Sequence, residues 1–442
     1  MPIKVGMVSL GCSKNLVDSE RMLYKLRQRG YELVTEPGLA DIAVVNTCGF
    51  IQSAKEEAID TIIELGKLKE DGTLKKIIIT GCLTERYREE AAELFPEADA
   101  VIGIGNNKDI VDILDHVLAG ERIVNFAPKL DAELTGERII STLPFFAYLK
   151  VAEGCSNCCT YCAIPQIRGK FRSVPMEDVL EEAKWLVKNG VTELIVIAQD
   201  TTRYGEDLYG ESKLPELLQK LSEIDGVKWV RTLYCYPERI TDKLLETIAE
   251  NDKIISYLDI PIQHCNGEIL SKMNRWGDKE KLSELIAHIR AKVPDIIIRT
   301  TLITGFPNES EEQFEELAEF VQAQRFDRLG CFAYSQEEGT KAAEFENQLE
   351  EEVKSHRADI IMEQQMLISA ENNEKLLEKE LTAVVEGFDK FGECYFGRTE
   401  MDAPDIDGKV FFTSENPLEI GDFVKIKISD TLDYDLIGEV IS

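Results

Sequence analysis

The residues best suited to chemistry are three closely spaced cysteines, Cys155, Cys159 and Cys162, in the run GCSNCCTYCAIP. Their C-x3-C-x2-C spacing supplies three thiolates, one fewer than a complete cuboidal iron–sulfur cluster commonly uses. A cluster held by three thiolates leaves one iron free to bind another molecule. The spacing therefore predicts redox chemistry on a bound small molecule rather than electron storage alone.

Cys158 leaves a second register open, because Cys155-x2-Cys158-x3-Cys162 is also possible from spacing alone. A zinc site within CSNCCTYC is a further alternative. The cysteine pairs of structural zinc sites usually lie farther apart in the chain, which favours the iron–sulfur interpretation.

A second set of three cysteines follows three predicted strands of the first 125 residues: Cys12 in LGC, Cys48 in NTC and Cys82 in TGC. Short apolar strands (KVGMVSL, DIAVVN, KKIIIT) alternate there with helices predicted at 18–29, 53–68 and 85–94, a βαβ pattern typical of a parallel sheet covered by helices on both faces. The carboxyl ends of parallel strands lie at one edge, so we expect these thiols to converge. The alternative is that each is an ordinary buried cysteine.

The elements that position the first triad begin at residue 145. Strands are predicted at 146–152 and at ELIVIA, KWVRTL, SYLDIPI, IIIRTTLI and LGCFAY, with helices between them. Six such units suggest a partial TIM-like (β/α)6 barrel, whose chemistry would lie at the carboxyl ends of the strands. The cysteine run follows the first of these strands, in agreement with that geometry.

The sequence therefore predicts an α/β multidomain protein, and a length of 442 residues is typical of roughly three domains. We expect an amino-terminal parallel-sheet domain (1–125), a linker (126–144), the barrel (145–340), a connecting helical segment (341–379) and a small antiparallel β-barrel (380–442). The last domain is predicted from five short strands separated by Gly and Asp turns.

Composition limits the possible classes of protein. The net charge is −32 and 44% of the residues are hydrophobic, yet no apolar run approaches the roughly 20 residues of a membrane helix. We expect a soluble, cytoplasmic protein without a signal peptide. A disulfide framework is not expected for the eleven cysteines of an intracellular chain, so metal or catalytic use of thiols is favoured.

With two cysteine triads on two βα domains and a small terminal barrel, the whole chain resembles the methylthiotransferases of the radical S-adenosylmethionine (SAM) superfamily. Those enzymes combine a cluster-binding domain, a radical SAM barrel and a TRAM barrel. The branch that modifies a ribosomal protein is the most similar, through VSLGCSKNLVDSE, IAQDTTRYGEDL, LYCYP, PIQHCNGEILSKMNR, RTTLITGFPNESEEQF and FAYSQEEGTKAA.

The resemblance implies two 4Fe–4S clusters, one on Cys155, Cys159 and Cys162 and an auxiliary one on Cys12, Cys48 and Cys82. It implies that two SAM molecules are consumed, one giving a methyl group and one giving a radical. The product would be a methylthio group on the β-carbon of one aspartate of ribosomal protein S-twelve. A reductant such as flavodoxin or ferredoxin would be a partner, and both clusters should face one cavity.

Other residues are candidates for binding SAM or substrate. Tyr161 precedes the third barrel cysteine and is a candidate to flank the adenine, with ordinary packing as the alternative. Gln199 and Asp200 end a predicted strand, and Arg299 and Thr300 lie on another. His264 is read equally as structural or catalytic, and the remaining cysteines are expected to be unligated: Cys235, Cys265, Cys331 and Cys394.

The terminal barrel contains 5 Lys/Arg and 15 Asp/Glu between residues 380 and 442, a net charge of 5 − 15 = −10. So few cations make an RNA-binding face hard to build, and docking of a basic ribosomal protein is favoured. The aromatic residues Phe391, Tyr395, Phe396 and Phe411 are predicted to form barrel core, with stacking on bases as the alternative. A tRNA-adenosine methylthiotransferase and a non-catalytic iron–sulfur protein that binds ribosomes remain as alternatives.

Overall fold

The amino-terminal part forms the parallel sheet that the sequence predicts. The computed structural model describes residues 2–441, and its first sheet has the strand order β2-β1-β3-β4-β5-β6, parallel throughout. All six residues of β3, IAVVNT, are buried, as expected for a parallel strand covered on both faces. The strands are β1 (Lys4–Ser9), β2 (Glu32–Val34), β3 (Ile42–Thr47), β4 (Lys76–Gly81), β5 (Ala100–Ile102) and β6 (Ile123–Asn125).

Helices cover this sheet and differ in part from the prediction. They are α1 (Ser13–Arg29), η1 (Pro37–Leu39), α2 (Gln52–Glu70), α3 (Cys82–Tyr87), α4 (Glu89–Leu94), η2 (Ile104–Asp109), α5 (Ile110–Leu118) and η3 (Lys129–Asp131). The single helix predicted at 85–94 is wrong, because the chain breaks at Arg88, which has a φ of 45°. Arg88 holds this conformation through tertiary contacts: it donates to the carbonyl oxygen of Phe126 and lies over its ring.

The central sheet confirms the predicted partial barrel. Its six parallel strands have the order β14-β13-β12-β11-β10-β7. The strands are β7 (Phe146–Lys150), β10 (Glu193–Ile197), β11 (Trp229–Thr232), β12 (Ile254–Asp259), β13 (Ile297–Thr304) and β14 (Arg328–Ala333), and a two-stranded sheet pairs β8 (Ala152–Glu153) with β9 (Arg172–Ser173).

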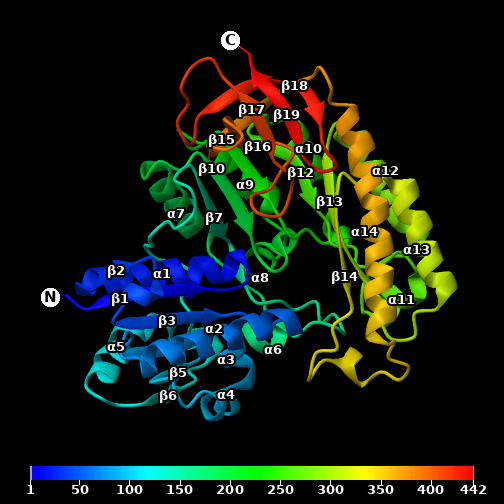
Figure 1. The fold of residues 1–442 in the computed structure, drawn as a ribbon. Coiled ribbons are helices and arrows are strands. Elements are labelled where there is room, and N and C mark those ends of the chain that lie inside the picture. The colour runs from blue at the N-terminus through cyan, green and yellow to red at the C-terminus, as the bar shows by residue number, and fades with distance from the viewer. Residues whose placement is uncertain (1, 442) are drawn as a thin grey trace.

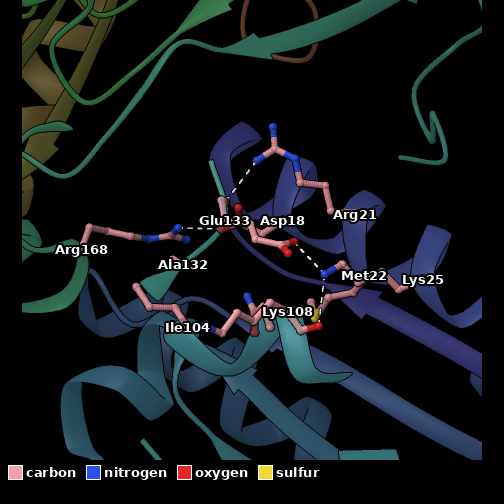
Figure 2. A pocket seen from close by; sticks show the side chains of 10 residues that line it. Asp18, Arg21, Met22, Lys25, Ile104, Lys108, Ala132, Glu133 and Arg168 are labelled. Carbon is pink, nitrogen blue, oxygen red and sulfur yellow. Dashed lines mark hydrogen bonds and ion pairs between the residues drawn. The ribbon is translucent and has the colours of Figure 1, made fainter. Parts of the chain in front are cut away.

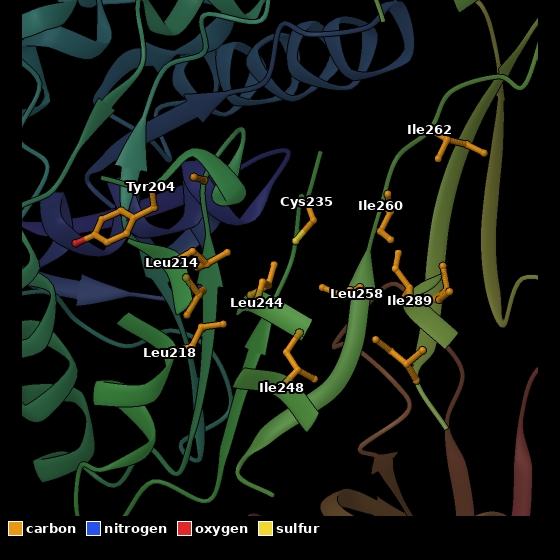
Figure 3. Packing of buried hydrophobic residues seen from close by; sticks show 14 of the residues in the cluster. Tyr204, Leu214, Leu218, Cys235, Leu244, Ile248, Leu258, Ile260, Ile262 and Ile289 are labelled. Atoms are coloured by element: carbon orange, nitrogen blue, oxygen red, sulfur yellow. The ribbon is translucent and has the colours of Figure 1, made fainter. Parts of the chain in front are cut away.

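Helices alternate with the central strands, and most of them enclose the outer face of the sheet. They are α6 (Ile164–Arg168), α7 (Met176–Lys188), η4 (Thr201–Arg203), α8 (Glu206–Tyr209), α9 (Leu214–Ser222), η5 (Pro237–Arg239), α10 (Asp242–Ala249), α11 (Gly267–Lys272), α12 (Lys279–Lys292), α13 (Glu311–Gln324), η6 (Lys341–Glu344) and α14 (Glu351–Glu374). Apolar residues of these helices, such as Leu218, Leu244 and Ile289, pack on strand residues such as Leu258 (Figure 3). This layer is the largest core of the molecule. Helix α6 instead packs on α3 of the amino-terminal domain.

The inner face of the central sheet is covered by the two other domains. Phe146, Tyr148 and Tyr257 of the sheet share a core with Val17 of α1 and with Ala403 of the terminal barrel. The terminal barrel also forms ion pairs at the beginnings of the central strands, where Arg398 pairs with Glu193 and Asp402 with Arg328. The amino-terminal domain and the terminal barrel therefore lie at opposite ends of the central sheet (Figure 1).

The terminal barrel has five strands in the closed order β15-β16-β17-β19-β18. They are β15 (Glu380–Asp389), β16 (Cys394–Thr399), β17 (Val410–Thr413), β18 (Phe423–Thr431) and β19 (Leu436–Val440). Four pairings are antiparallel as predicted, but β17 and β19 are parallel. A ring with an odd number of strands cannot alternate in direction all the way round, so one parallel pairing is needed for closure.

One prediction about this barrel is wrong. Phe391 is fully exposed, and together with the half-buried Phe396 and Phe411 it lines a surface groove that also contains Lys390 and Lys409. Of the four aromatic residues predicted to form core, Tyr395 packs against the barrel interior. Phe391 lies in the turn between β15 and β16, where alternation along a strand no longer determines which way a side chain points.

Candidate functional site

The first three cysteines lie at the carboxyl edge of the amino-terminal sheet. Cys12 is the N-cap of α1, Cys48 follows β3 directly, and Cys82 is the first residue of α3. Their strands β1, β3 and β4 are neighbours in the sheet. The parallel topology therefore brings together three cysteines that are far apart in sequence.

The loops that carry these cysteines are in close contact. A Cβ on Gly11 would lie 2.9 Å from Sγ of Cys48, and a Cβ on Gly49 would lie 2.7 Å from the backbone of Leu83. Gly11 also has a φ of +87°, in the region that favours glycine. Glycine at these two positions allows the loops to pack closely enough for their thiols to face one another.

Asn15 joins the three loops, and the sequence analysis did not identify it. Its Nδ2 donates to the carbonyl oxygens of Leu10 and Thr47, each at 2.9 Å. The thiol of Cys82 lies 3.5 Å from its Oδ1. Asn15 is fully buried in the first turn of α1, and its place three residues after Cys12 in LGCSKN was the available signal.

The environment of this triad favours protonated thiols, whose protons a bound metal would displace. Burial raises the pKa of the Cys82 thiol to about 12, against the opposing effect of nearby Arg168. Burial also raises the pKa of Cys48, and the thiolate of Cys12 adds to that effect. Thiols with raised pKa values stay protonated until a metal replaces their protons, so binding would be coupled to proton release.

The second triad lies on the loop between β8 and α6. Cys155 donates its backbone N–H to the carbonyl oxygen of Gly169 at 3.0 Å, and a turn joins Cys162 to Cys159. Loops at the carboxyl edge of the barrel hold this segment: the backbone N–H of Thr160 donates to Met273, and Asn157 Nδ2 donates to Asp200 at 2.8 Å. The cysteine loop is therefore fixed at the edge where barrel chemistry is expected.

Cys158 and Cys159 differ in environment. Cys159 is 7% exposed, with its Sγ 3.6 Å from the Tyr236 hydroxyl and 3.9 Å from Arg275 Nη1. Cys158 is exposed and has a φ of 53°. This arrangement favours the register Cys155, Cys159 and Cys162, and it adds Tyr236 and Arg275 as neighbours that the sequence analysis did not single out.

Burial dominates the electrostatics of the barrel triad as well. It raises the pKa of Cys155 to about 11 and raises that of Cys162 further, with thiolate neighbours contributing to both. Within residues 2–441, no three His, Cys, Asp or Glu side chains are grouped to hold a single metal ion. A cuboidal cluster does not need such a group, because each thiolate binds a different iron.

The candidate SAM residues have distinct environments. Tyr161 packs beside Met273 and Phe306, and burial together with the thiolate of Cys159 raises its pKa. Gln199 donates from Nε2 to Glu153 at 3.0 Å, while its buried Oε1 has no hydrogen-bond partner among the described residues. Arg299 forms ion pairs with Asp259 and with Asp407 of the terminal barrel.

The other candidates have structural partners. Asp200 accepts hydrogen bonds from Asn157 and Thr202. Thr300 donates from Oγ1 to the carbonyl oxygen of Ile260, and buried His264 lies 3.5 Å from Glu309. Three of the cysteines expected to be unligated, Cys235, Cys265 and Cys331, are buried in the outer core, and Cys394 is half-buried on the terminal barrel.

The two triads are connected through α6. Cys82 forms a small buried cluster with Ala163, which directly follows Cys162 and is the N-cap of α6, and with Ile167, which lies in α6. Arg168, the last residue of α6, reaches from the barrel to Asp18 of α1 (Figure 2). No sequence pattern indicates Arg168, because only the assembled domains bring it beside Cys82.

Three family models match separate parts of the chain. They are described as Uncharacterized protein family UPF0004 (residues 4–103), Radical SAM superfamily (149–321) and TRAM domain (379–441). The first match contains Cys12, Cys48 and Cys82, and the second contains Cys155, Cys159 and Cys162.

Curated relatives match almost the full length. A protein of Thermoanaerobacter sp. (strain X514) named ribosomal protein uS12 methylthiotransferase RimO is 48% identical over 437 residues, covering 98% of this chain and 99% of the relative. A protein of the same name from Desulforamulus reducens is 49% identical over 441 residues, covering 99% of each chain.

Solved structures with the same fold are more distant in sequence. The radical SAM methyltransferase TsrM from Kitasatospora setae, solved with cobalamin and a 4Fe–4S cluster, has a TM-score of 0.55 at 13% identity over 75% of each chain. The cobalamin-dependent radical SAM enzyme OxsB has a TM-score of 0.51 at 14% identity, over 82% of this chain and 56% of that one. These likenesses show the fold.

Proposed function

This chain belongs to the RimO family of radical SAM methylthiotransferases, and from that premise we propose that it places a methylthio group on the β-carbon of one aspartate of ribosomal protein uS12. The observation that carries the proposal is the contact of Cys82 with the segment that follows the barrel cysteines. Cys82 packs on the helix that directly follows Cys162, so a substrate carbon could be near both triads within one site.

The proposal assigns one 4Fe–4S cluster to Cys155, Cys159 and Cys162 and an auxiliary one to Cys12, Cys48 and Cys82, with two SAM molecules consumed per product. When bound, these groups supply the one-electron chemistry that activates an unreactive carbon–hydrogen bond and the sulfur that is transferred. Soft thiol donors in threes, without disulfide partners, are the donor set that such clusters require.

The protein's own residues bind and shield these groups. Gln199 Oε1 is a buried acceptor with no partner among the described residues, which suits the ammonium or a hydroxyl group of SAM. Tyr236 and Arg275 cover Cys159 from the barrel interior and keep water from it. Tyr161 is the candidate to flank the adenine. Arg299 is a weaker candidate, since two carboxylates of the chain already neutralise it.

The proposal extends to the partners. The terminal barrel carries a net charge of 5 − 15 = −10 and suits docking of a basic ribosomal protein more than of RNA. Reduction would require a donor such as flavodoxin or ferredoxin. The part of the chain that the structure describes contains no helix long and apolar enough to cross a membrane.

A paired substrate assay tests the proposal. The anaerobically reconstituted, reduced protein is given SAM with either ribosomal protein uS12 or bulk tRNA, and mass spectrometry follows the replacement of one hydrogen by one methylthio group. We expect the modification on one aspartate of uS12. A modified adenosine in tRNA, or the absence of SAM cleavage altogether, would contradict the proposal.

A further inference from the structure

Arg168 joins the two triads physically. It ends α6, the helix that follows the loop of barrel cysteines, and its side chain is 3% exposed. We propose that Arg168 is a positioning residue that holds Cys82 against the barrel and donates a hydrogen bond to its sulfur, thereby tuning the group bound by the amino-terminal triad. The inference rests on the proposed function, because it requires a cluster on Cys12, Cys48 and Cys82.

The contacts of Arg168 divide between the two domains. Its Nη1 donates to Asp18 Oδ2 at 2.6 Å in the amino-terminal domain and to Glu153 Oε2 at 3.2 Å in the barrel. Its Nη2 donates to Asn15 Oδ1 and lies 3.4 Å from Sγ of Cys82. One guanidinium therefore contacts the barrel, the residue that joins the three cysteine loops, and one of the cysteines.

The hydrogen bond to sulfur is not explained by the need to neutralise acids. Nη1 alone makes the two carboxylate contacts of Arg168, and Lys150 also contacts both Asp18 and Glu153, so the acids are neutralised without Nη2. Nη2 points away from these carboxylates toward Asn15 and Cys82. This division of donors requires the planar fork of arginine, since a lysine ammonium presents its charge at a single point.

The surroundings make this hydrogen bond effective. Cys82 is 6% exposed and packs against Ala163 and Ile167, which exclude water from the sulfur. Hydrogen bonds and charges act more strongly in such a dry environment than in water. Hydrogen bonds to cluster sulfurs and nearby positive charge are established determinants of cluster reduction potential. Both stabilise the reduced cluster, which carries one more negative charge than the oxidised cluster, and so raise the reduction potential.

The test isolates the amino-terminal triad. In the full-length chain, Cys155, Cys159 and Cys162 are replaced by Ser, and the protein is reconstituted without oxygen. The midpoint potential of the remaining cluster is measured by redox titration followed by electron paramagnetic resonance. The series compares Arg168 with Arg168→Lys, Arg168→Met and Arg21→Met.

Arg21 is the matched control, because it is a buried arginine of the same interface. It donates to Glu182 and to the Glu133 carbonyl oxygen (the latter contact is drawn in Figure 2), and none of its hydrogen bonds within residues 2–441 involves a cysteine. We expect Arg168→Met to shift the potential to a more negative value and Arg168→Lys to shift it less. Arg21→Met should leave the potential unchanged, even if it lowers thermal stability.

An iron-loaded Arg168→Met protein with an unchanged potential would overturn the inference and leave the proposed function intact. If Arg168→Met does not fold, as judged by circular dichroism, an unchanged potential in Arg168→Lys overturns it equally. If the parent serine variant binds no iron at all, both the cluster assignment and this inference fail.

Discussion

Asn15 shows how one side chain can organise a site built from distant segments. Its amide donates to the loops before Cys12 and Cys48 and accepts from Cys82 and Arg168. The three loops that carry these cysteines have few other interactions that hold the thiols in place, because their backbone groups are not paired within a strand or helix. The loss of this one amide should therefore disturb all three cysteines together.

We expect Asn15→Ala to lose the iron of the amino-terminal triad and to lower the free energy of unfolding by about 1–3 kcal/mol, because buried carbonyl oxygens lose their donors. Iron and acid-labile sulfide counts, with denaturant unfolding, measure both effects. Asn106→Ala is the control, since Asn106 is a buried asparagine of the same domain that bonds to Ala127. Full iron content in Asn15→Ala would contradict the assignment.

The register of the barrel triad is a second prediction at the residue scale. Cys159→Ser should abolish the barrel cluster, whereas Cys158→Ser should leave it, because Cys159 is buried beside Tyr236 and Cys158 is exposed. Iron and sulfide counts on the two reconstituted variants decide between the registers. The reverse pattern would establish Cys158 as the ligand.

At the scale of elements, the strands were predictable and the turns were not. Each strand of the terminal barrel alternates or clusters apolar residues in a way that indicates its buried face. The turn from β15 to β16 has no such constraint, and it carries the exposed Phe391 that was assigned to the core.

This difference predicts that two substitutions in one barrel lower its stability by very different amounts. Phe412 in β17 is 1% exposed, so Phe412→Ala should lower the free energy of unfolding by about 3–5 kcal/mol. Phe391→Ala should change it by less than about 0.5 kcal/mol, because the ring is fully exposed. Denaturant titrations of the two variants compare them, and equal losses of stability would show that Phe391 is packed.

At the scale of the whole molecule, a buried carboxylate fastens the amino-terminal domain to the barrel. Glu337, in the loop after β14, accepts hydrogen bonds from Lys55 at 3.0 Å and Arg86 at 2.6 Å. Burial by itself raises the pKa of Glu337, but hydrogen bonds from Ser335, Arg86 and Lys55 outweigh it and hold the pKa below its ordinary value of 4.5.

Glu337→Gln should therefore destabilise the protein by about 3–5 kcal/mol at neutral pH, because it leaves two buried cations without a counter-charge. A carboxylate with a lowered pKa stabilises the fold above its unfolded pKa and loses that contribution as pH falls. The difference between Glu337 and Gln should accordingly shrink below about pH 4.5. Thermal unfolding across pH measures this, with exposed Glu338→Gln as the control, and a difference independent of pH would contradict it.

The terminal barrel lies at the beginnings of the central strands, while the barrel cysteines lie beyond their ends. The central strands are four to eight residues long, and this length separates the two edges by roughly 13–26 Å. If ribosomal protein uS12 docks on the terminal barrel, as proposed, it must extend a segment along the molecule to reach the cysteines. The proposed docking surface and the cysteine triads are thus separate, which allows them to be tested separately.

We expect Glu393→Lys and Glu415→Lys, on the exposed face of the terminal barrel, to raise KM for ribosomal protein uS12 roughly two- to five-fold, in line with the small energies of exposed charges. SAM cleavage without uS12 should not change. Steady-state kinetics at several salt concentrations measures the effect, and Glu57→Lys on α2 is the control. An equal increase in KM for the control would place docking elsewhere.

The sequence by itself determined the classes of element and the residues capable of chemistry. Apolar runs such as IAVVNT and ELIVI specify buried parallel strands wherever they fold, and cysteines placed after such strands must meet at the carboxyl edge. Both predictions follow from local sequence patterns and from a general rule of parallel-sheet topology, so they do not depend on how the domains assemble.

Only the tertiary structure decided how the two triads relate. Arg168 reaches Asn15 and Cys82 across 153 and 86 residues of chain, and Cys82 packs on Ala163 and Ile167. The break at Arg88 and the exposure of Phe391 were equally hidden from sequence. Such contacts depend on how whole domains pack against one another. That packing is determined by the shape and charge of entire surfaces and not by the spacing of apolar residues along one segment.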